Sequence, residues 1–187
     1  MEVFFVIKFI HSTFKITMKD NPTLAKFKTI KTFLFDVDGV MTDGTFIIQE
    51  DGQFLRKMNA QDGFMVKTII EKGYQVAILT GGRSEGVRKR FQKLGVKEIY
   101  LGLRHKIEAF EELMSIYRWD KNEILYMGDD LPDYEVLQAV GLPCCPANAV
   151  PEIKGICEYV SPYKGGEGCV RDVIEKVLRL NDQWDWV

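Results

Sequence analysis

The sequence has no strong excess of charge of either sign, no cysteine pair with metal-binding spacing and no internal repeat. Its 187 residues carry a formal net charge of −2, so it lacks the basic footprint that nucleic-acid-binding proteins show. The four cysteines form no CxxC pair and match no zinc spacing, which favours ordinary thiols of a reducing compartment. A hydrophobic content of 46% is enough for one domain with a sizeable core.

The first residues differ in character from the rest of the chain. Residues 1–14 are apolar and aromatic, but they are too short a stretch, and too often interrupted by charge, for a membrane span. They also lack the small-residue cleavage site of a signal peptide. We therefore predict that residues 1–23 are a loose extension or a mispredicted start, and that residues 24–187 form a single domain.

From about residue 30 onward, segments with strand character alternate with segments of helical period. Short apolar runs predict buried strands, which we place at residues 33–35, 74–79, 99–101, 124–127 and 158–160. Apolar residues at helical spacing fill most of the intervals, for example between Ser84 as an N-cap and Gly95 as a stop. This alternation predicts an α/β fold, a doubly wound, Rossmann-like architecture with a mostly parallel central sheet.

Residues 42–58 carry a hairpin signal. An Asp-Gly pair at residues 51–52 separates two β-like runs, which predicts a two-stranded flap beside the end of the first strand. No long insertion follows it, so we expect no cap domain. Residues 59–63 are interpreted as a polar connector, leading into a helix that has Phe64 on its apolar face.

Three predicted strands end in polar or acidic residues. Asp36 and Asp38 follow the first strand, Thr80 ends the second, and Asp129 and Asp133 follow the strand at residues 124–127. One such end could be an ordinary solvated turn. In a doubly wound sheet, however, the three ends share one edge, where so many carboxylates would repel one another without a cation. Ligands that are all oxygen atoms favour a hard ion, above all Mg²⁺.

A bound phosphate needs neutral hydrogen-bond donors and a positively charged side chain. Thr80, the amides of Gly81 and Gly82, and Lys106 at the predicted start of a helix are the candidates. Arg104 is an alternative to Lys106, and the helix-start position favours the lysine.

These motifs, in this order, resemble those of the haloacid dehalogenase-like phosphohydrolase superfamily. The run Asp-Val-Asp-Gly-Val at residues 36–40 is similar to its first motif, Thr80 to its second, Lys106 to its third, and Gly-Asp-Asp-Leu-Pro-Asp at residues 128–133 to its fourth. The resemblance covers residues 30 to about 180.

The resemblance implies roles for the acidic residues. Asp36 would be the nucleophile that forms an aspartyl-phosphate, and Asp38 would be the general acid and then the general base. Mg²⁺ would be held by Asp36, the backbone carbonyl of Asp38, and Asp129, with Asp130 and Asp133 as outer or variable ligands. Phosphoryl transfer is mostly positioning and charge neutralisation, which a metal, a lysine and a hydroxyl provide.

A closer resemblance is to the family of 3-deoxy-D-manno-octulosonate 8-phosphate (KDO 8-phosphate) phosphatases. It is carried by the flap without a cap, by residues 59–63, by the Thr-Gly-Gly-Arg-Ser run from Thr80, and by the glycine-rich residues 165–168. It implies a cytoplasmic homotetramer that acts in lipopolysaccharide biosynthesis and whose subunits cap one another's active sites. It also implies contacts to the substrate, with Arg83 facing the carboxylate of the sugar acid, from Asn59, Ala60, Gln61, Asp62, Gly63, Gly81, Gly82 and Arg83.

Several alternatives stay open at this point. The substrate could be the 9-phosphate of a nine-carbon deoxy sugar acid (KDN 9-phosphate), or the chain could use the fold only as a binding or assembly module. Arg83 could be a solvated residue at a helix start, and residues 165–168 could be only a hinge. Trp184 and Trp186 could anchor a neighbouring subunit or belong to a frayed end.

Overall fold

A computed structural model describes residues 5–9, 12–16 and 22–186 of the chain. In the first two stretches, β1 (Phe5–Phe9) and β2 (Ser12–Ile16) pair antiparallel with each other. The expectation of a loose extension over residues 1–23 falls partly outside the described residues, and it stays a prediction. None of the helices in the described part is long and apolar enough to cross a membrane.

Six parallel strands form the central sheet. Their spatial order is β10 (Tyr159–Val160), β9 (Leu142–Cys145), β8 (Ile124–Met127), β3 (Thr32–Phe35), β6 (Gln75–Leu79) and β7 (Glu98–Tyr100). Every neighbouring pair in this order is parallel, which confirms the doubly wound fold. The chain runs outward from β3 to β7 and then returns to the other side of β3. The switch point, where such sheets bind ligands, therefore lies between β3 and β8.

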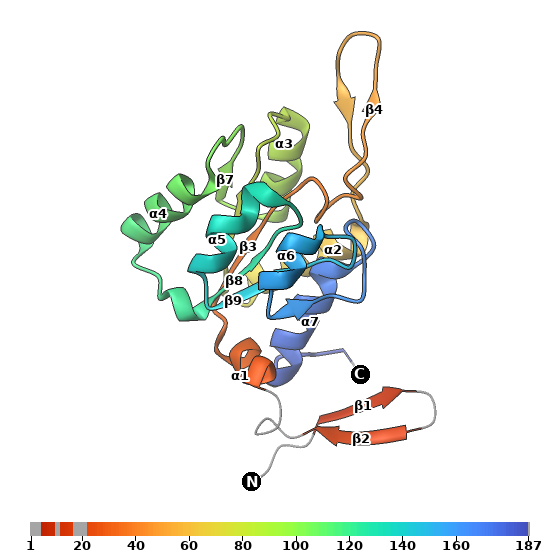
Figure 1. Cartoon of the computed structure of the whole chain (residues 1–187), viewed down its shortest axis with the longest axis vertical. Coiled ribbons are helices and arrows are strands. Elements are labelled where there is room, and N and C mark those ends of the chain that lie inside the picture. Colours follow the sequence, from red (N-terminus) through yellow and green to blue (C-terminus); the bar gives the residue numbers. More distant parts are fainter. Residues whose placement is uncertain (1–4, 10–11, 17–21, 187) are drawn as a thin grey trace.

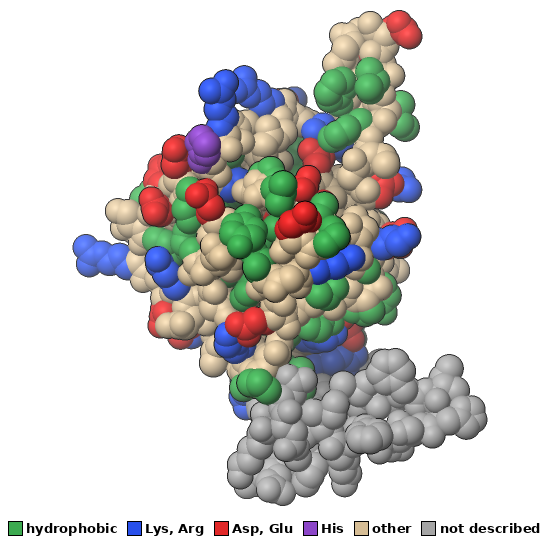
Figure 2. All heavy atoms as spheres, viewed as in Figure 1, with side chains coloured by type: hydrophobic (Ala, Val, Ile, Leu, Met, Phe, Trp, Pro, Cys, Tyr) green, Lys and Arg blue, Asp and Glu red, His purple; other side chains and the backbone are tan. Residues whose placement is uncertain are grey.

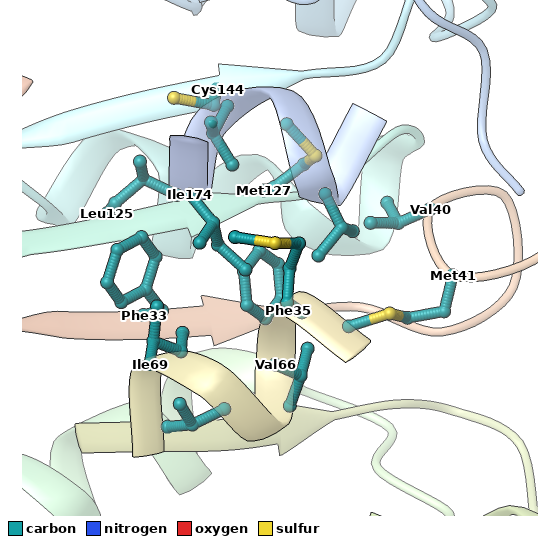
Figure 3. Packing of buried hydrophobic residues seen from close by; sticks show 14 of the residues in the cluster. Phe33, Phe35, Val40, Met41, Val66, Ile69, Leu125, Met127, Cys144 and Ile174 are labelled. Atoms are coloured by element: carbon teal, nitrogen blue, oxygen red, sulfur yellow. The ribbon is translucent and has the colours of Figure 1, made fainter. Parts of the chain in front are cut away.

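Helices cover both faces of the sheet (Figure 1). One face carries α1 (Pro22–Thr29), α2 (Ala60–Glu71), α3 (Glu85–Leu94) and α7 (Cys169–Leu180), and the other carries α4 (Lys106–Tyr117), α5 (Tyr134–Ala139) and α6 (Pro151–Ile156). Figure 3 shows Phe33 and Phe35 of β3 packed against Ile69 of α2 and Ile174 of α7. Leu34, between the two phenylalanines, belongs to the cluster on the opposite face, as expected for a strand buried on both sides.

The predicted flap is present as a hairpin that projects from the body of the protein (Figure 1). Its strands β4 (Ile47–Ile48) and β5 (Phe54–Leu55) pair antiparallel, and Gly52 in the turn has a φ of +82°, which favours glycine. The described residues contain no further insertion, so the expectation of a fold without a cap domain is confirmed.

Three local predictions were wrong. Residues 60–63 are the first turn of α2 rather than a connector, because the Asn59 side chain accepts a hydrogen bond from the Gln61 amide and caps the helix. Phe64 does not face the core: it is 51% exposed, and its ring lies 5.6 Å from that of Trp186. The strand predicted at residues 99–101 lies one residue earlier.

Candidate active site

The carboxyl ends of β3, β6 and β8 open onto a cavity of about 390 Å³, which we call the inner cavity. The first residue of α4 and the loops after these strands complete its wall. The inner cavity is where nine of the predicted site residues meet, and they are Asp36, Asp38, Thr80, Gly81, Gly82, Lys106, Asp129, Asp130 and Asp133. Arg104, the alternative to Lys106, also lines it but is exposed, whereas Lys106 is buried.

Lys106 joins two acids that come from different strands. Its Nζ lies 2.9 Å from Oδ1 of Asp36 and 2.6 Å from Oδ1 of Asp133. Burial opposes the charge of Lys106, yet the two carboxylates raise the pKa of its ammonium group. Burial and the charge of Asp133 raise the pKa of Asp36 to about 8. One ammonium group is thus too little positive charge for the acids gathered here, as expected for a site that takes a cation.

Both carboxylate oxygens of Asp133 have protein partners. Oδ1 accepts hydrogen bonds from Lys106 Nζ and from the hydroxyl of Tyr126, and Oδ2 accepts from the amides of Asp129 and Asp130 at 3.0 and 3.3 Å. Asp133 therefore holds the loop after β8 in shape. Sequence reasoning did not single out Tyr126, because the residue lies inside an apolar strand and its hydroxyl has no partner nearby in the sequence.

Asp129 brings the loop after β8 against the loop after β3. A Cβ atom at Gly39, where φ is +93°, would lie 2.0 Å from Oδ2 of Asp129, so only glycine permits this approach. Burial and the charge of Asp133 raise the pKa of Asp129 to about 7. Oxygen atoms of Asp36, Asp129 and Asp133 all lie within 4.8 Å of one another. This buried set, made of oxygen alone, fits Mg²⁺, with Asp36 and Asp129 as the acids that still have oxygen atoms to offer.

Thr80 directly follows β6, lines the same cavity and is 2% exposed. Its hydroxyl accepts a hydrogen bond from the Gly82 amide at 3.1 Å, and its backbone is held by Tyr100 and Leu103 on the neighbouring segment. The hydroxyl proton of Thr80 is therefore free to point toward a bound oxyanion.

A second space of about 620 Å³, the outer cavity, lies between the hairpin and the start of α3. It shares Asp38, Phe46, Gly81 and Gly82 with the inner cavity, and Arg83 lines it. A residue that the sequence analysis missed, Arg56, lines the outer cavity and forms an ion pair with Asp38, which lines both cavities. No local signal marks this contact, because it depends on how the hairpin folds back.

Residues 59–63 line neither cavity of the single chain. Asp62 is buried, and its Oδ1 accepts a hydrogen bond from the Arg171 amide at the start of α7; burial raises its pKa. The Asn59 amide group donates to the Gly166 carbonyl, and a Cβ atom at Gly63 would lie 2.3 Å from Nη2 of Arg90. Of the five, only Ala60 and Gln61 are exposed.

The glycine-rich residues 165–168 are more than a hinge. A Cβ atom at Gly165 would lie 1.8 Å from the carbonyl oxygen of Gly39, and the Gly166 amide donates to the Val40 carbonyl. The loop thus presses against the turn that follows Asp36 and Asp38. After α7, the tail folds back on its own chain. The rings of Trp184 and Trp186 meet edge to face, and the Arg179 guanidinium lies over the Trp184 ring at 4.5 Å.

Comparison with known families identifies the class of protein to which this sheet and cavity belong. The family model described as haloacid dehalogenase-like hydrolase matches residues 98–174. A KDO 8-phosphate phosphatase of Yersinia pestis is 35% identical over 154 residues, which are 82% of each chain. The enzyme of the same name from Escherichia coli K12 is 33% identical over 162 residues, covering 87% of this chain and 86% of the relative.

Solved structures agree. The crystal structure of the Yersinia pestis KDO 8-phosphate phosphatase matches with a TM-score of 0.86 and 30% identity, covering 98% of this chain and 95% of that one. The enzyme of Moraxella catarrhalis, solved in complex with magnesium, phosphate and KDO, matches with a TM-score of 0.85 and 31% identity, covering 88% and 95%. The chain belongs to the family of the 3-deoxy-D-manno-octulosonate 8-phosphate phosphatases, within the haloacid dehalogenase-like hydrolases.

Proposed function

We propose that this protein is a Mg²⁺-dependent phosphomonoesterase that hydrolyses KDO 8-phosphate to KDO and phosphate, in lipopolysaccharide biosynthesis. The observation that carries the proposal is the inner cavity, in which Asp36, Thr80, Lys106 and Asp129 come from four separate segments to line one space. Burying this many like charges around one lysine is energetically costly, which favours a working site over a site that has lost its activity.

In the first half of the reaction, a carboxylate oxygen of Asp36 attacks phosphorus and the bond from phosphorus to the ester oxygen breaks. Asp38 gives a proton to the departing alkoxide, which leaves as the free sugar acid. Thr80 and the Gly81 amide donate hydrogen bonds to the phosphoryl oxygens, and Lys106 holds Asp36 in the attacking position.

In the second half, a water molecule attacks the phosphorus of the aspartyl-phosphate. Asp38 takes the proton of that water, the bond between phosphorus and the Asp36 oxygen breaks, and phosphate leaves. Mg²⁺ held by Asp36 and Asp129, with the Asp38 carbonyl, supplies positive charge that neutralises the phosphate and keeps the carboxylates ionised.

The outer cavity is the proposed place for the sugar acid. Its position beside Asp38 is where a leaving group would lie, and the Arg83 guanidinium can face a carboxylate in it. Ala60 and Gln61, which are exposed but lie outside both cavities, would then serve a neighbouring subunit.

The hairpin supports a proposed homotetramer in which subunits cap one another's sites. Figure 2 shows apolar side chains gathered on this projecting segment, and their exposed fractions run from 41% to 70% for Phe46, Ile47, Ile48, Phe54 and Leu55. Exposed apolar surface of this kind marks an interface. We propose that the assembly works in the cytoplasm, where the sugar phosphate would be made.

Phosphate release from a panel of esters tests the proposal. We expect the highest kcat/KM for KDO 8-phosphate, and loss of turnover when EDTA removes the metal. Faster turnover of KDN 9-phosphate would move the substrate assignment to the nine-carbon acid. Turnover of other esters but of neither deoxy sugar acid phosphate would refute the substrate and leave the chemistry intact. No phosphatase activity on any ester, with Mg²⁺ present, would favour a binding module.

A further inference from the structure

Arg56 and Asp38 form a two-pronged ion pair at the boundary of the inner and outer cavities. Nε of Arg56 lies 2.7 Å from Oδ1 of Asp38, and Nη2 lies 3.0 Å from Oδ2. The arginine follows β5 directly, so the hairpin carries it, whereas Asp38 belongs to the loop after β3. The contact joins residues 18 positions apart.

The guanidinium is fixed on its other sides as well. Nη1 donates to the Phe54 carbonyl at 3.3 Å, and the ring of Phe46 lies 4.7 Å from the central carbon. The arginine side chain is only 9% exposed, although it is carried by a projecting hairpin. A solvent-facing ion pair of mobile side chains would contribute little, but a two-pronged pair held by a ring and a carbonyl has one defined geometry.

Gly82 makes room for this pair. A Cβ atom there would lie 3.0 Å from Nη2 of Arg56 and 3.1 Å from Oδ2 of Asp38, so a side chain would press on both partners. Three segments, the hairpin, the loop after β3 and the loop after β6, thus meet at one carboxylate.

We propose that Arg56 is a positioning residue for proton transfer, and that it acts by holding the Asp38 side chain toward the ester oxygen of the substrate. Asp38 itself is 24% exposed and sits on a loop, so without the arginine its side chain has other rotamers open to it. Proton transfer at one oxygen requires only one of the two arms to open, and the other arm then keeps the carboxyl group in place. The inference rests on the proposed role of Asp38 and on no particular sugar.

The test is the dependence of kcat/KM on the leaving group. A series of aryl phosphates of matched size, from p-nitrophenyl through phenyl to 4-methoxyphenyl phosphate, changes the need for a proton donor but not the fit of a sugar. For Arg56→Gln we expect kcat/KM to be nearly unchanged for p-nitrophenyl phosphate and to fall about 10- to 100-fold for the poorest leaving group. Arg56→Lys keeps the positive charge but cannot form the two-pronged pair. Its kcat/KM for the poorest leaving group should therefore lie between those of wild type and Arg56→Gln.

Three further measurements make the result decisive. In an Asp38→Asn background, Arg56→Gln should change nothing more, because the group it positions is gone. Lys57→Gln, an exposed neighbour on the same strand end, is the matched control and should keep the wild-type slope. An unchanged kcat/KM for p-nitrophenyl phosphate, which reports the first half of the reaction alone, shows that the Arg56 variant is folded.

An equal loss of kcat/KM on all esters, a loss of kcat/KM that persists in the Asp38→Asn background, or a rise in KM with kcat unchanged would each overturn the proposal. A wild-type enzyme that hydrolyses the aryl esters but not KDO 8-phosphate would refute the substrate assignment alone.

Discussion

Asp36 is the residue on which both the chemistry and the electrostatics of the inner cavity depend. It is 6% exposed and shares Lys106 with Asp133. We expect Asp36→Asn to lower phosphate release at least about 1,000-fold, because it removes the nucleophile. The same change should raise the melting temperature of the metal-free protein, since it removes one of several crowded buried acids. Phosphate assays and calorimetry check both, with Glu111→Gln on the exposed side of α4 as the control; activity within a few-fold of wild type would contradict the mechanism.

Tyr126 gives a second prediction for a single residue, because its hydroxyl donates to Asp133 in a fully buried position. Burial and the charge of Asp133 raise its pKa well above the ordinary value, so the phenol stays protonated and remains a donor. Tyr126→Phe should cost about 1 kcal/mol of unfolding free energy by removing one buried hydrogen bond. It should also lower kcat, since the loop that carries Asp129 loses part of its anchor. Denaturant titration measures the first effect. The control is Tyr134→Phe, because the Tyr134 hydroxyl makes an exposed contact within one helical turn, where it accepts a hydrogen bond from Gln138 on its own helix; equal losses in both variants would refute the role.

Among the elements, the glycine-rich loop at residues 165–168 packs directly against the turn that follows Asp36 and Asp38. Gly165→Ala would force a methyl group against the Gly39 carbonyl, and we expect a loss of about 1–3 kcal/mol of stability as for other overpacked sites. Activity should fall further than stability explains, because the displaced turn carries Asp38. Gly155→Ala in α6 is a matched control, since nothing lies within 4 Å of its added methyl group. Urea unfolding and phosphate release at a temperature where both variants are folded separate the two effects. Unchanged kcat in Gly165→Ala would show that the loop does not position the turn.

The elements also show which parts of the fold can be predicted from the sequence. Strands such as β3 and β8 are predictable because a short apolar run carries the signal within itself. The motif residues at their ends follow, because parallel strands share an edge. The first turn of α2 was misread because N-terminal helix residues are polar and resemble a loop. The Arg56–Asp38 pair could not be predicted, because a two-pronged contact between a hairpin and a turn depends on the hairpin's angle to the sheet, which no local pattern encodes.

At the scale of the whole molecule, the apolar hairpin has a consequence for assembly. Ile48 is 70% exposed on a segment that extends away from the body of the chain (Figure 2). We expect Ile48→Asp to give smaller species than the proposed tetramer in light scattering, because a buried charge in an apolar interface is strongly unfavourable. Ile116→Asp on α4, where the isoleucine is 58% exposed, should leave the mass unchanged. A wild-type protein that is monomeric at micromolar concentration would refute the proposed assembly.

The crowding of acids also links metal binding to the pH dependence of stability for the molecule as a whole. The pKa values of Asp36 and Asp129 rise from 3.8 to about 8 and about 7 in the folded, metal-free chain, because of burial and the nearby Asp133. A group whose pKa is raised on folding contributes its full stability below the unfolded value and loses it as the pH rises through the folded value. The metal-free protein should therefore melt at lower temperatures as the pH rises from 5 to 8.5, and Mg²⁺, which binds the ionised carboxylates, should restore stability most at the alkaline end. Calorimetry at several pH values measures this slope, and titration of Mg²⁺ in two buffers of different ionisation enthalpy counts the protons released. A slope that is unchanged in Asp36→Asn, or metal binding without proton release at pH 6.5, would contradict this account, because the acids would then already be ionised before the ion arrives.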